Sequence, residues 1–339
     1  MMAPLPLLKC DRRLPSHRAL LLAAVALLAL ALASCTPARG SSLSWTERQT
    51  IVGGGFDAVA CPTAGSCVAL VGSVQSRKLN GTTWSASTPV EQVSRSDASS
   101  GLTCVRATWC ATFDGLGRVL TYDGEHWSRP VQVDTAAAQI TGISCATSDF
   151  CAIVDADGDA AIYNGVRWSS PTAVVDSSGL VAVSCPSTGV CFAIDVQSDE
   201  VFRYAGGKWK LSDDLNLSTP QGGSEPNSLA AISCGSRSFC VALDAFGEAF
   251  TYNGKDWSGA HPFDNLKNGS AALSCTRALA CVAVDDNNNA VVDDNGAWSA
   301  PYHLDAAGTL LVGVSCASLE RCVAIDGQSG YFITDAMKN

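Results

Sequence analysis

Cysteines recur through this chain with a spacing that few folds can accommodate. Fourteen of the 16 cysteines form seven pairs, and the two members of every pair are six positions apart. The first members of successive pairs follow one another at intervals of 40 to 43 residues, with one interval of 49. The pairs are Cys61/Cys67, Cys104/Cys110, Cys145/Cys151, Cys185/Cys191, Cys234/Cys240, Cys275/Cys281 and Cys316/Cys322. A pattern repeated in this way predicts seven copies of one structural unit.

The paired cysteines have two chemical interpretations, disulfide formation and metal binding. Positions i and i+6 face each other across a hairpin, at a separation that suits a disulfide. Zinc sites usually draw four ligands at closer spacing, and no pair has a histidine beside it. Redox chemistry would need one special pair, whereas all seven are alike. The spacing therefore predicts seven disulfides in an oxidising, exported setting, without a metal or cofactor.

A pattern of short strands surrounds each cysteine pair. In the fifth repeat residues 241–244 are apolar at successive positions, which predicts a strand covered on both faces. A turn and another short strand, 249–252, come next. Asn253-Gly254 then predicts a two-residue hairpin in which both residues adopt positive φ, and a final strand carries a tryptophan. Each repeat of about 41 residues thus predicts four antiparallel strands, the content of one propeller blade.

The two ends of the chain predict how the ring closes. The seventh repeat contains its cysteine pair and the strand 331–334, but the chain ends at Asn339 before any further tryptophan. Residues 44–46, Ser-Trp-Thr, match the missing fourth strand and precede the first cysteine pair. We therefore expect an all-β fold, a seven-bladed β-propeller of four-stranded antiparallel blades whose N-terminal strand closes the last blade.

The first 34 residues differ in composition from all that follows. Four basic residues precede fifteen apolar residues at 19–33, a run too short to cross a bilayer comfortably. The string Leu32-Ala33-Ser34-Cys35 resembles the lipobox of bacterial lipoproteins, and the resemblance implies cleavage before Cys35 and acylation of that cysteine, palmitate included. The alternative is an ordinary secreted protein with a cysteine near the cut. We expect a signal peptide at 1–34, a lipidated linker at 35–43 and the propeller at 44–339, anchored to the outer face of the bacterial cell membrane.

Composition and charge narrow the class of partner. Apolar residues make up 47% and charged residues 16% of the chain, which predicts a packed globular body. The leader contains four of the 22 basic residues and one of the 32 acidic residues, so its removal leaves 18 basic and 31 acidic side chains and a net charge of −13. Such a surface repels nucleic acid and anionic lipid, and membrane contact would come through the lipid on Cys35. We expect a monomer.

The repeated string Cys-x5-Cys-Val-Ala-Val-Asp with Tyr-Asn-Gly-x-x-Trp-Ser resembles secreted actinobacterial proteins with sialidase-like, BNR-type propeller repeats. The resemblance spans almost the whole chain after the leader and implies the propeller architecture. The Ser-x-Asp-x-Gly-x-x-x-Trp box of true sialidases is absent, and no arginine triad can be assigned. The resemblance therefore implies the architecture without the catalysis of sialidases.

An aspartate lies four residues after the second cysteine in six of the seven repeats, and Val71 replaces it in the first. These residues are expected at one face of the ring, where they form a candidate binding face: Asp114, Asp155, Asp195, Asp244, Asp285 and Asp326. The alternative is a structural role, because Asp followed by Gly three positions on is typical of a type I turn. Clusters at 155–159 and 285–288 could supply oxygen ligands for calcium, but neither has the spacing of an EF-hand.

Two further features could contribute to binding. The insertion at 211–226 is polar and rich in Gly and Pro, which predicts a surface loop on the aspartate face. It could equally be a loop without function. The periodic tryptophans could stack on sugars, but their regularity favours packing. Trp109 lies inside a cysteine loop, outside the periodic pattern, and is expected to be an exposed aromatic residue.

No catalytic residues can be nominated from the sequence. Motifs such as Gly-x-Ser-x-Gly and His-Glu-x-x-His are absent, and the histidines outside the leader are isolated at 126, 261 and 303. We therefore expect a non-catalytic module that binds an envelope protein, peptide or glycan. The alternative is a glycoside-processing enzyme of the sialidase-like propeller type that uses two carboxylates, an inference that depends on fold analogy.

Overall fold

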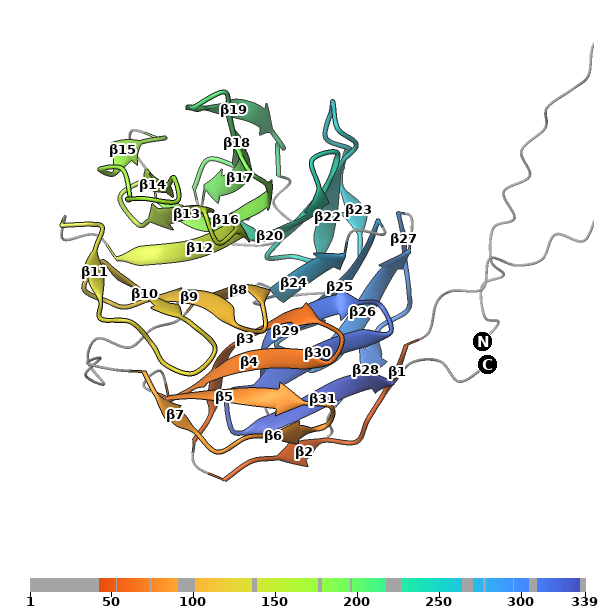
Figure 1. Cartoon of the computed structure of the whole chain (residues 1–339). Coiled ribbons are helices and arrows are strands. Elements are labelled where there is room, and N and C mark those ends of the chain that lie inside the picture. Colours follow the sequence, from red (N-terminus) through yellow and green to blue (C-terminus); the bar gives the residue numbers. More distant parts are fainter. Residues whose placement is uncertain are drawn as a thin grey trace, which may run out of the picture. The chain divides into compact units, whose positions relative to one another are not determined.

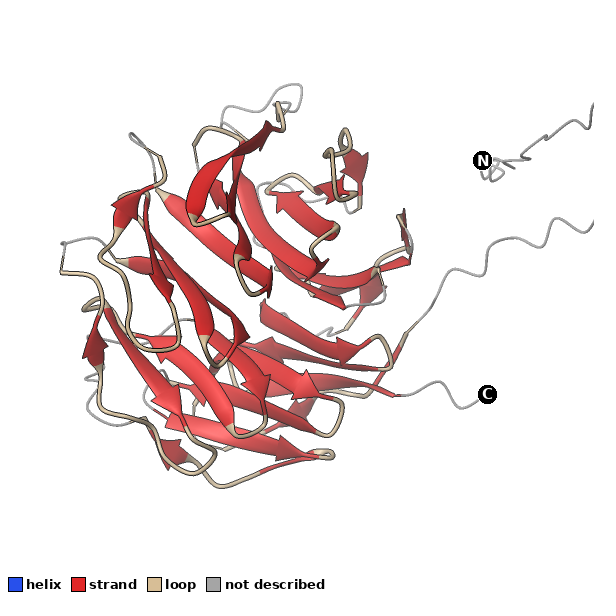
Figure 2. Ribbon diagram, turned by 45° about the horizontal axis from the view of Figure 1, so that its top comes forward, coloured by secondary structure: helices blue, strands red, loops and turns tan. Residues whose placement is uncertain are grey.

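Seven antiparallel β-sheets follow one another along the chain and form the blades of a ring (Figure 1). The computed structural model describes residues 43–335 except 53, 73–74, 91–100, 136–138, 176–178, 196, 218–226, 264–270, 277–278, 295 and 305–309. In these ranges every regular element is a strand (Figure 2). None of the described residues forms a helix that could cross a bilayer. The predicted leader and Cys35 lie outside the described residues.

Blades 1 to 4 each run from the inner strand outward in chain order. Blade 1 comprises β3 (Phe56–Thr63), β4 (Ser66–Val71), β5 (Gln75–Asn80), β6 (Thr83–Trp84) and β7 (Thr88–Pro89). Blade 2 comprises β8 (Leu102–Arg106), β9 (Trp109–Phe113), β10 (Arg118–Tyr122) and β11 (Val131–Gln132). Blade 3 comprises β12 (Ile140–Thr147), β13 (Phe150–Asp155), β14 (Asp159–Tyr163) and β15 (Thr172–Ala173). Blade 4 comprises β16 (Leu180–Ser187), β17 (Val190–Asp195), β18 (Glu200–Ala205) and β19 (Lys208–Asp214).

Blades 5 and 6 repeat this order, and blade 7 takes strands from both ends of the chain. Blade 5 comprises β20 (Leu229–Ser236), β21 (Phe239–Asp244), β22 (Glu248–Tyr252) and β23 (His261–Pro262). Blade 6 comprises β24 (Ala271–Thr276), β25 (Ala280–Asp285), β26 (Asn289–Asp294), β27 (Ala297–Trp298) and β28 (Tyr302–His303). Blade 7 comprises β29 (Leu311–Ser318), β30 (Arg321–Asp326), β31 (Gly330–Asp335), β1 (Ser44–Trp45) and β2 (Gln49–Thr50). The predicted seven-bladed propeller is confirmed.

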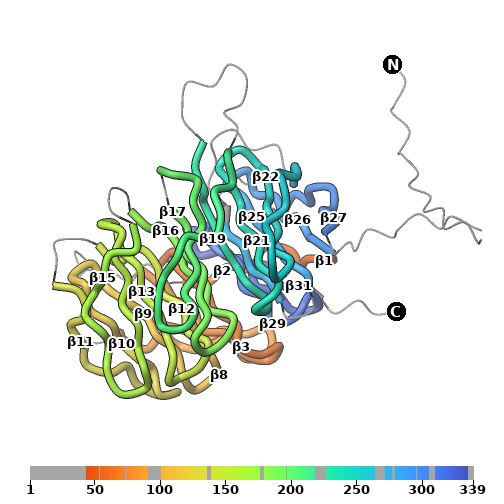
Figure 3. The backbone as a smooth tube through the Cα atoms, turned by 90° about the horizontal axis from the view of Figure 1, so that it is seen from above, coloured from red at the N-terminus to blue at the C-terminus, as the bar shows by residue number. Residues whose placement is uncertain are grey.

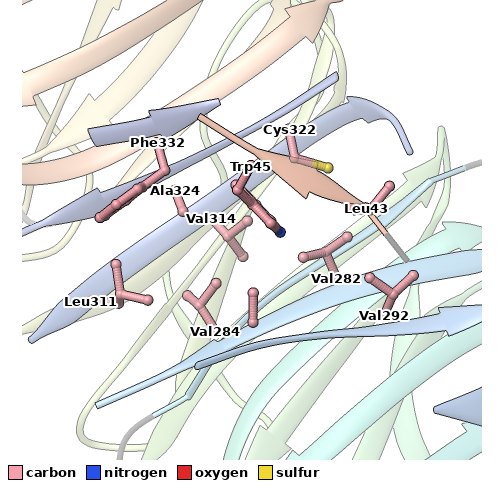
Figure 4. Packing of buried hydrophobic residues seen from close by; sticks show 11 residues of the cluster. Leu43, Trp45, Val282, Val284, Val292, Leu311, Val314, Cys322, Ala324 and Phe332 are labelled. Carbon is pink, nitrogen blue, oxygen red and sulfur yellow. The ribbon is translucent and has the colours of Figure 1, made fainter. Parts of the chain in front are cut away.

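The N-terminal strand closes the ring, as the sequence predicts. In the antiparallel pair of β1 and β31, Ser44 lies opposite Asp335 and Trp45 opposite Thr334. The Trp45 side chain packs among buried residues of blades 6 and 7, including Phe332 (Figure 4). The inner strand β29 of blade 7 contacts the inner strand β3 of blade 1, so the last blade meets the first and the ring is closed.

Polar contacts secure the same closure. The Arg48 guanidinium, in the segment between β1 and β2, forms an ion pair with the Asp326 carboxylate in blade 7, with an N–O distance of 2.7 Å. The Tyr331 hydroxyl donates a hydrogen bond to Gln49 Oε1 at 2.7 Å. Because these partners are far apart in sequence, the closure depends on the folded ring and cannot form in a short fragment.

Each disulfide joins the first two strands of a blade. All seven predicted pairs are bonded, with Cα–Cα distances of 3.9 to 4.1 Å. In five blades the two cysteines stand directly opposite in register, Cys145 and Cys151 among them. The disulfide prediction is confirmed. Seven such bonds indicate an oxidising, extracytoplasmic environment.

The two cysteines of each pair differ in burial. The first cysteine ends the inner strand and is half-buried in five of the seven blades, whereas the second lies on a strand covered on both faces. The second cysteines are buried in every blade, with exposed fractions of 0 to 1%: Cys67, Cys110, Cys151, Cys191, Cys240, Cys281 and Cys322. The second cysteines are therefore core positions, and each disulfide holds the first two strands of its own blade together.

The prediction of a two-residue hairpin at Asn-Gly or Asp-Gly before the tryptophan is wrong for blades 2, 3 and 5. In blade 5 the loop has four residues, 253–256, and Asn253 Oδ1 accepts two backbone N–H groups of that loop at 2.9 Å each. Positive φ is confined to Gly254, at 96°, and a Cβ at that position would lie 2.8 Å from Ser238 Cβ. The Asn side chain thus closes the loop, a role that short polar side chains perform in turns. Blade 4 has the predicted hairpin geometry, at Gly206-Gly207, with φ values of 59° and 81°.

A ring of side-chain hydrogen bonds joins the inner strands. The residue before the first cysteine is serine or threonine in six blades, and its hydroxyl oxygen accepts the backbone N–H of the first cysteine in the next blade. Donor and acceptor are Cys145/Thr103, Cys185/Ser144, Cys234/Ser184, Cys275/Ser233, Cys316/Ser274 and Cys61/Ser315, at 2.9 to 3.3 Å. In blade 1 Ala60 has no hydroxyl to offer blade 2. The repeated Ser-Cys pair is visible in the sequence, but our sequence analysis did not assign it this role.

Buried apolar side chains fill the junctions between neighbouring blades. The described residues contain seven such clusters, one for each junction of the closed ring. In each blade the periodic tryptophan packs toward the preceding blade. Four of these residues are buried, namely Trp45, Trp84, Trp127 and Trp257. The other three, Trp168, Trp209 and Trp298, are half-buried.

The residue after the tryptophan completes the outer edge of the blade. In five blades this residue is a serine that forms two hydrogen bonds with one residue of the third strand. In blade 2, for example, the Ser128 N–H donates to the Thr121 carbonyl at 2.7 Å, and the Thr121 N–H donates to Ser128 Oγ at 3.0 Å. Thr46 makes the same two bonds with Ile333, at 2.9 and 3.0 Å. The N-terminal strand therefore uses the hydrogen-bond chemistry of the repeats. In blade 4 Lys210 replaces the serine, and β19 is a regular seven-residue strand.

Candidate functional site

All six aspartates of the predicted binding face are buried, with exposed fractions of 0 to 2%. Five of them end the second strand of their blade, and Asp114 directly follows β9. Each accepts a backbone N–H from the following turn; Asp244 Oδ1, for example, accepts the N–H of Phe246 at 2.9 Å and of Glu248 at 2.8 Å. The equivalent bonds occur at Asp114, Asp155, Asp195, Asp285 and Asp326. The carboxylates therefore hold the turns in shape. Ligand binding by this face stays a prediction.

The second carboxylate oxygen of these aspartates has different surroundings from blade to blade. In four blades it faces a nitrogen of a side chain: Arg118 beside Asp114, Asn227 beside Asp244, Asn289 beside Asp285 and Arg48 beside Asp326. Despite burial, the hydrogen bonds from Arg48 and from the turn lower the pKa of Asp326. This carboxylate is ionised and contributes to ring closure.

Asp155 in blade 3 has the opposite electrostatic environment. Burial raises the pKa of Asp155 to about 6, and the carboxylates of Asp134 and Asp159 add to the effect. Burial and Asp134 likewise raise the pKa of Asp159. Asp134 belongs to the segment after β11, so like charges meet across the junction of blades 2 and 3.

The described residues offer little for metal binding or acid–base catalysis. No group of three or more His, Cys, Asp or Glu side chains among them is arranged to hold a metal ion. The three histidines lie on separate blades, in the loop before Trp127, in β23 and in β28, and all three are exposed. In this part of the chain His303 Nδ1 lies 3.3 Å from Asn289 Oδ1, and none of the three histidines is paired with a hydroxyl or thiol nucleophile.

The insertion after blade 4 is only partly a loop. Residues 211–214 continue β19, which corrects the expectation of a surface loop from residue 211 onward. Leu215 and Leu217 pack against the buried cluster between blades 4 and 5. Residues 218–226 lie outside the described residues.

The junction between blades 1 and 2 is closed at its outer edge. The Trp127 side chain is 4% exposed, and its indole N–H donates a hydrogen bond to Ser76 Oγ in blade 1 at 2.9 Å. Lys78 on β5 places its ammonium group 5.1 Å from the centre of the Tyr122 ring, which packs against Trp127. The junction between blades 4 and 5 is similar, since Trp257 donates to Ser212 Oγ at 3.4 Å.

The junction between blades 2 and 3 has an open groove of about 450 Å³ instead. Trp109 from β9 lines it on the blade 2 side, and Tyr163 and Trp168 line it on the blade 3 side, with their ring centroids 5.4 Å apart. Val131 and Val166 also line the groove and are 53% and 85% exposed. Figure 3 shows the outer strands β10, β11 and β15 at this side of the ring. Exposed apolar side chains gathered around aromatic walls are typical of a ligand site.

Polar groups are placed around the aromatic walls. Arg167 and Gln132 line the groove together with the hydroxyls of Ser128 and Ser148. Gln132 Nε2 donates to the Leu116 carbonyl at 2.8 Å, which fixes its amide. The Arg167 side chain is exposed, and the ion pairs found among the described residues do not include it. The groove thus combines stacking surfaces with a cation and hydrogen-bonding groups.

One position of the third strand separates the closed junction from the open one. Lys78 on β5 and Thr121 on β10 occupy equivalent sites, because each bonds the serine that follows the tryptophan of its own blade. The long side chain of Lys78 covers the aromatic residues of blade 2. Thr121 lines the groove and is too short to cover those of blade 3. At this junction a short residue therefore stands where blade 1 has a long one, and the aromatic residues of blade 3 stay uncovered on this side.

Sequence analysis found part of this site. The sequence predicts an exposed Trp109, and this residue is a half-buried wall of the groove. Trp168 was missed because it is one of the periodic tryptophans that we assigned to packing. The short Thr121 at the position of Lys78 is visible in the sequence, but Thr251 and Val292 stand at the same position in blades 5 and 6, so this position alone does not identify the groove.

Comparisons with known proteins support the fold. No protein-family description matches the chain, and no curated protein matches it. Among solved structures, YCF48 bound to D1 peptide shares 11% identity with a TM-score of 0.65, over 86% of this chain and 96% of the other. Virginiamycin B lyase from Staphylococcus aureus, in a catalytically inactive form with quinupristin, shares 7% identity with a TM-score of 0.71, over 86% and 99%. The WD40 β-propeller domain of Doa1 shares 9% identity with a TM-score of 0.68, over 87% and 98%.

These similarities define the class of protein as a seven-bladed β-propeller. Identities of 7 to 11% are too low to transfer a site or an activity. The similar structures include a peptide complex, a WD40 β-propeller domain and a lyase, so the fold is compatible with both binding and catalysis.

Proposed function

We propose that this protein is a non-catalytic binding module of the bacterial cell envelope. The groove between blades 2 and 3 is the observation that carries the proposal, because it exposes Trp109, Trp168 and Val166 where the equivalent junction of blades 1 and 2 is filled. Exposing large apolar side chains is costly for a soluble surface unless a partner covers them. The ligand is an envelope protein, peptide or glycan, and the protein acts as a monomer.

The site of action follows from the disulfides and the leader. Seven disulfides need an exported location, and the Leu32-Ala33-Ser34-Cys35 string supports removal of the 1–34 signal peptide and lipid attachment at Cys35. In this proposal residues 35–43 link the lipid to the propeller at 44–339. The sialidase-like, BNR-type string of the repeats accounts for the blade architecture. The YCF48 complex with D1 peptide supplies a precedent for a protein of this fold that binds a peptide.

The aspartate face has a defined place in this proposal. The six buried carboxylates shape the turns, and any contact on that face comes from exposed turn residues such as Leu116, which is 50% exposed. Single Asp→Asn changes would therefore weaken such contacts gradually. The alternative function, a glycosidase that uses two of these carboxylates, requires that one such change abolish turnover. The lyase among the similar structures is the observation that keeps an enzyme under consideration.

A capture experiment with the intact lipoprotein tests the binding proposal. The protein is cross-linked in native membranes, purified and analysed by mass spectrometry, as wild type and as Thr121→Lys, which fills the groove in the manner of Lys78. The control is Thr251→Lys, the same change at the equivalent position of blade 5. We expect Thr121→Lys to lose the captured component and Thr251→Lys to keep it. Equal capture by both variants would exclude the groove as the binding site.

A further inference from the structure

A second groove flanks blade 3 on its other side. It has a volume of about 420 Å³ and lies between blades 3 and 4. Tyr204 and Trp209 line it, with ring centroids 5.4 Å apart, the same separation as that of Tyr163 and Trp168. The third-strand residue at this junction is Ile162, again without a charged end to cover the aromatic pair. The two grooves are thus successive copies of one arrangement, one blade apart.

In both grooves a basic residue directly precedes the tryptophan, which is not the case at the closed junctions. Arg167 directly precedes Trp168 and lines the first groove, and Lys208 directly precedes Trp209 and lines the second. The buried tryptophans follow other residues: Ser44, Thr83, His126 and Asp256. Open groove, aromatic pair and basic residue therefore occur together in blades 3 and 4. In a chain of net charge −10, this clustering of cations beside exposed rings indicates an anionic ligand.

We propose that the two grooves together bind one anionic glycan chain, whose sugar rings stack on Trp168 and Trp209 and whose charged groups meet Arg167 and Lys208. The proposal rests on the binding function above and specifies its ligand. A polymer of repeating units suits the site because the two grooves repeat the same ring and cation. The acidic groups carried by the glycan are carboxylates or phosphodiesters, to which both cations can donate charge-assisted hydrogen bonds.

The contacts around each ring fit a sugar better than an extended peptide. Each indole lies tilted against its tyrosine, so an apolar ring face is offered beside hydroxyl-bearing residues, Ser148 in the first groove and Ser169 and Thr172 in the second. A sugar ring presents an apolar face and equatorial hydroxyls together, whereas a peptide would seek unpaired backbone groups. The third-strand edge offers no such group at Ile162, whose backbone N–H and C=O are both bonded to Ser169.

Binding of defined oligosaccharides to the full-length protein in detergent tests the proposal. The probes are oligogalacturonates of increasing length, neutral galactan oligomers of the same lengths, a glycan with phosphodiester links, and polyglutamate, measured by calorimetry at low and at physiological salt. We expect the acidic oligosaccharides to bind, and affinity to rise at least about tenfold once the chain is long enough to reach both grooves. Preference between the carboxylate and the phosphodiester probe identifies the anionic group.

Substitutions show whether both grooves contribute. Arg167→Ala and Lys208→Ala should each lower the affinity for the long acidic probe about tenfold, bringing it near that of the short one. Trp298→Ala is the control, because Trp298 is half-buried but follows Ala297, and it should leave binding unchanged. Equal affinity for polyglutamate or for neutral galactan would overturn the proposal. If no glycan binds while Thr121→Lys still abolishes capture from membranes, the glycan inference fails and the binding function stands.

Discussion

The two junctions on either side of blade 2 use the same repeat in different ways. On the side of blade 1, Trp127 is buried, bonded to Ser76 and covered by Lys78. On the side of blade 3, Trp168 stands half-exposed in a groove with Trp109 opposite. The periodic tryptophan is therefore a packing residue by default, and the neighbouring blade decides whether it becomes available to a ligand. A regular scaffold can thus acquire a site through one or two small residues.

The largest expected difference between the two junctions is in stability. Trp127→Ala removes a buried indole and leaves Ser76 without its partner, so we expect a loss of about 3–5 kcal/mol in the free energy of unfolding. Trp168→Ala should cost about 1–2 kcal/mol, because the side chain is already partly in water. Urea unfolding of the oxidised protein, followed by tryptophan fluorescence and circular dichroism, measures both. Equal losses would show that the open junction is as tightly packed as the closed one.

The second difference is electrostatic and concerns the turns at the open junction of blades 2 and 3. Asp155 and Asp134 bring like charges together there, and the pKa of Asp155 is raised to about 6. Because the folded state holds this proton more tightly than the unfolded chain, stability should fall as pH rises from about 4 to 6 and stay low above that. The shift from 3.8 to about 6 corresponds to at most about 3 kcal/mol.

Asp155→Asn isolates this effect. Asn retains an acceptor for the turn N–H groups but carries no charge, so the variant should gain stability over wild type above about pH 6 and lose the advantage near pH 4. Asp326→Asn is the comparison, since Asp326 has a lowered pKa and an arginine partner. It should be destabilised at neutral pH and approach wild type only in acid below about pH 4. Melting temperatures from pH 3 to 8 would show these opposite trends, and parallel curves would refute them.

The sequence was sufficient for the architecture but insufficient for the site, and the reason is physical. The spacing of Cys145 and Cys151 fixes a hairpin by local geometry, and the spare strand at Trp45 can be matched to the missing strand of blade 7 by its own residues. Exposure of Trp168 depends instead on the residues that another blade places around it, Thr121 among them. The same holds for the loop geometry at Asn253, where the side chain bonds its own loop and changes the turn from the expected two residues to four.

The smallest expected effect is on stability and concerns the hydrogen bonds between the inner strands of neighbouring blades. Blade 1 alone lacks the hydroxyl that links neighbouring inner strands, because Ala60 stands where six blades have Ser or Thr. The junction of blades 1 and 2, which is closed at its outer edge, therefore lacks the hydrogen bond that the Cys104 N–H would donate at its inner edge. Ala60→Ser should supply this bond and raise the free energy of unfolding by about 0.5–1.5 kcal/mol. Ser233→Ala, the reverse change between blades 5 and 6, should lower it by about 1–3 kcal/mol, since the Cys275 N–H loses its acceptor.

Hydrogen exchange distinguishes a specific bond from a general effect of the added hydroxyl. In Ala60→Ser the amide of Cys104 should exchange more slowly, while the amides of the other inner strands keep their wild-type rates. If the variant is less stable, or if protection at Cys104 is unchanged, the inner ring of hydroxyls does not hold the blades together. The outer tryptophans and their apolar clusters would then hold neighbouring blades together without a contribution from the hydrogen bonds between inner strands. The open junction of blades 2 and 3 would in that case be the weakest point of the ring.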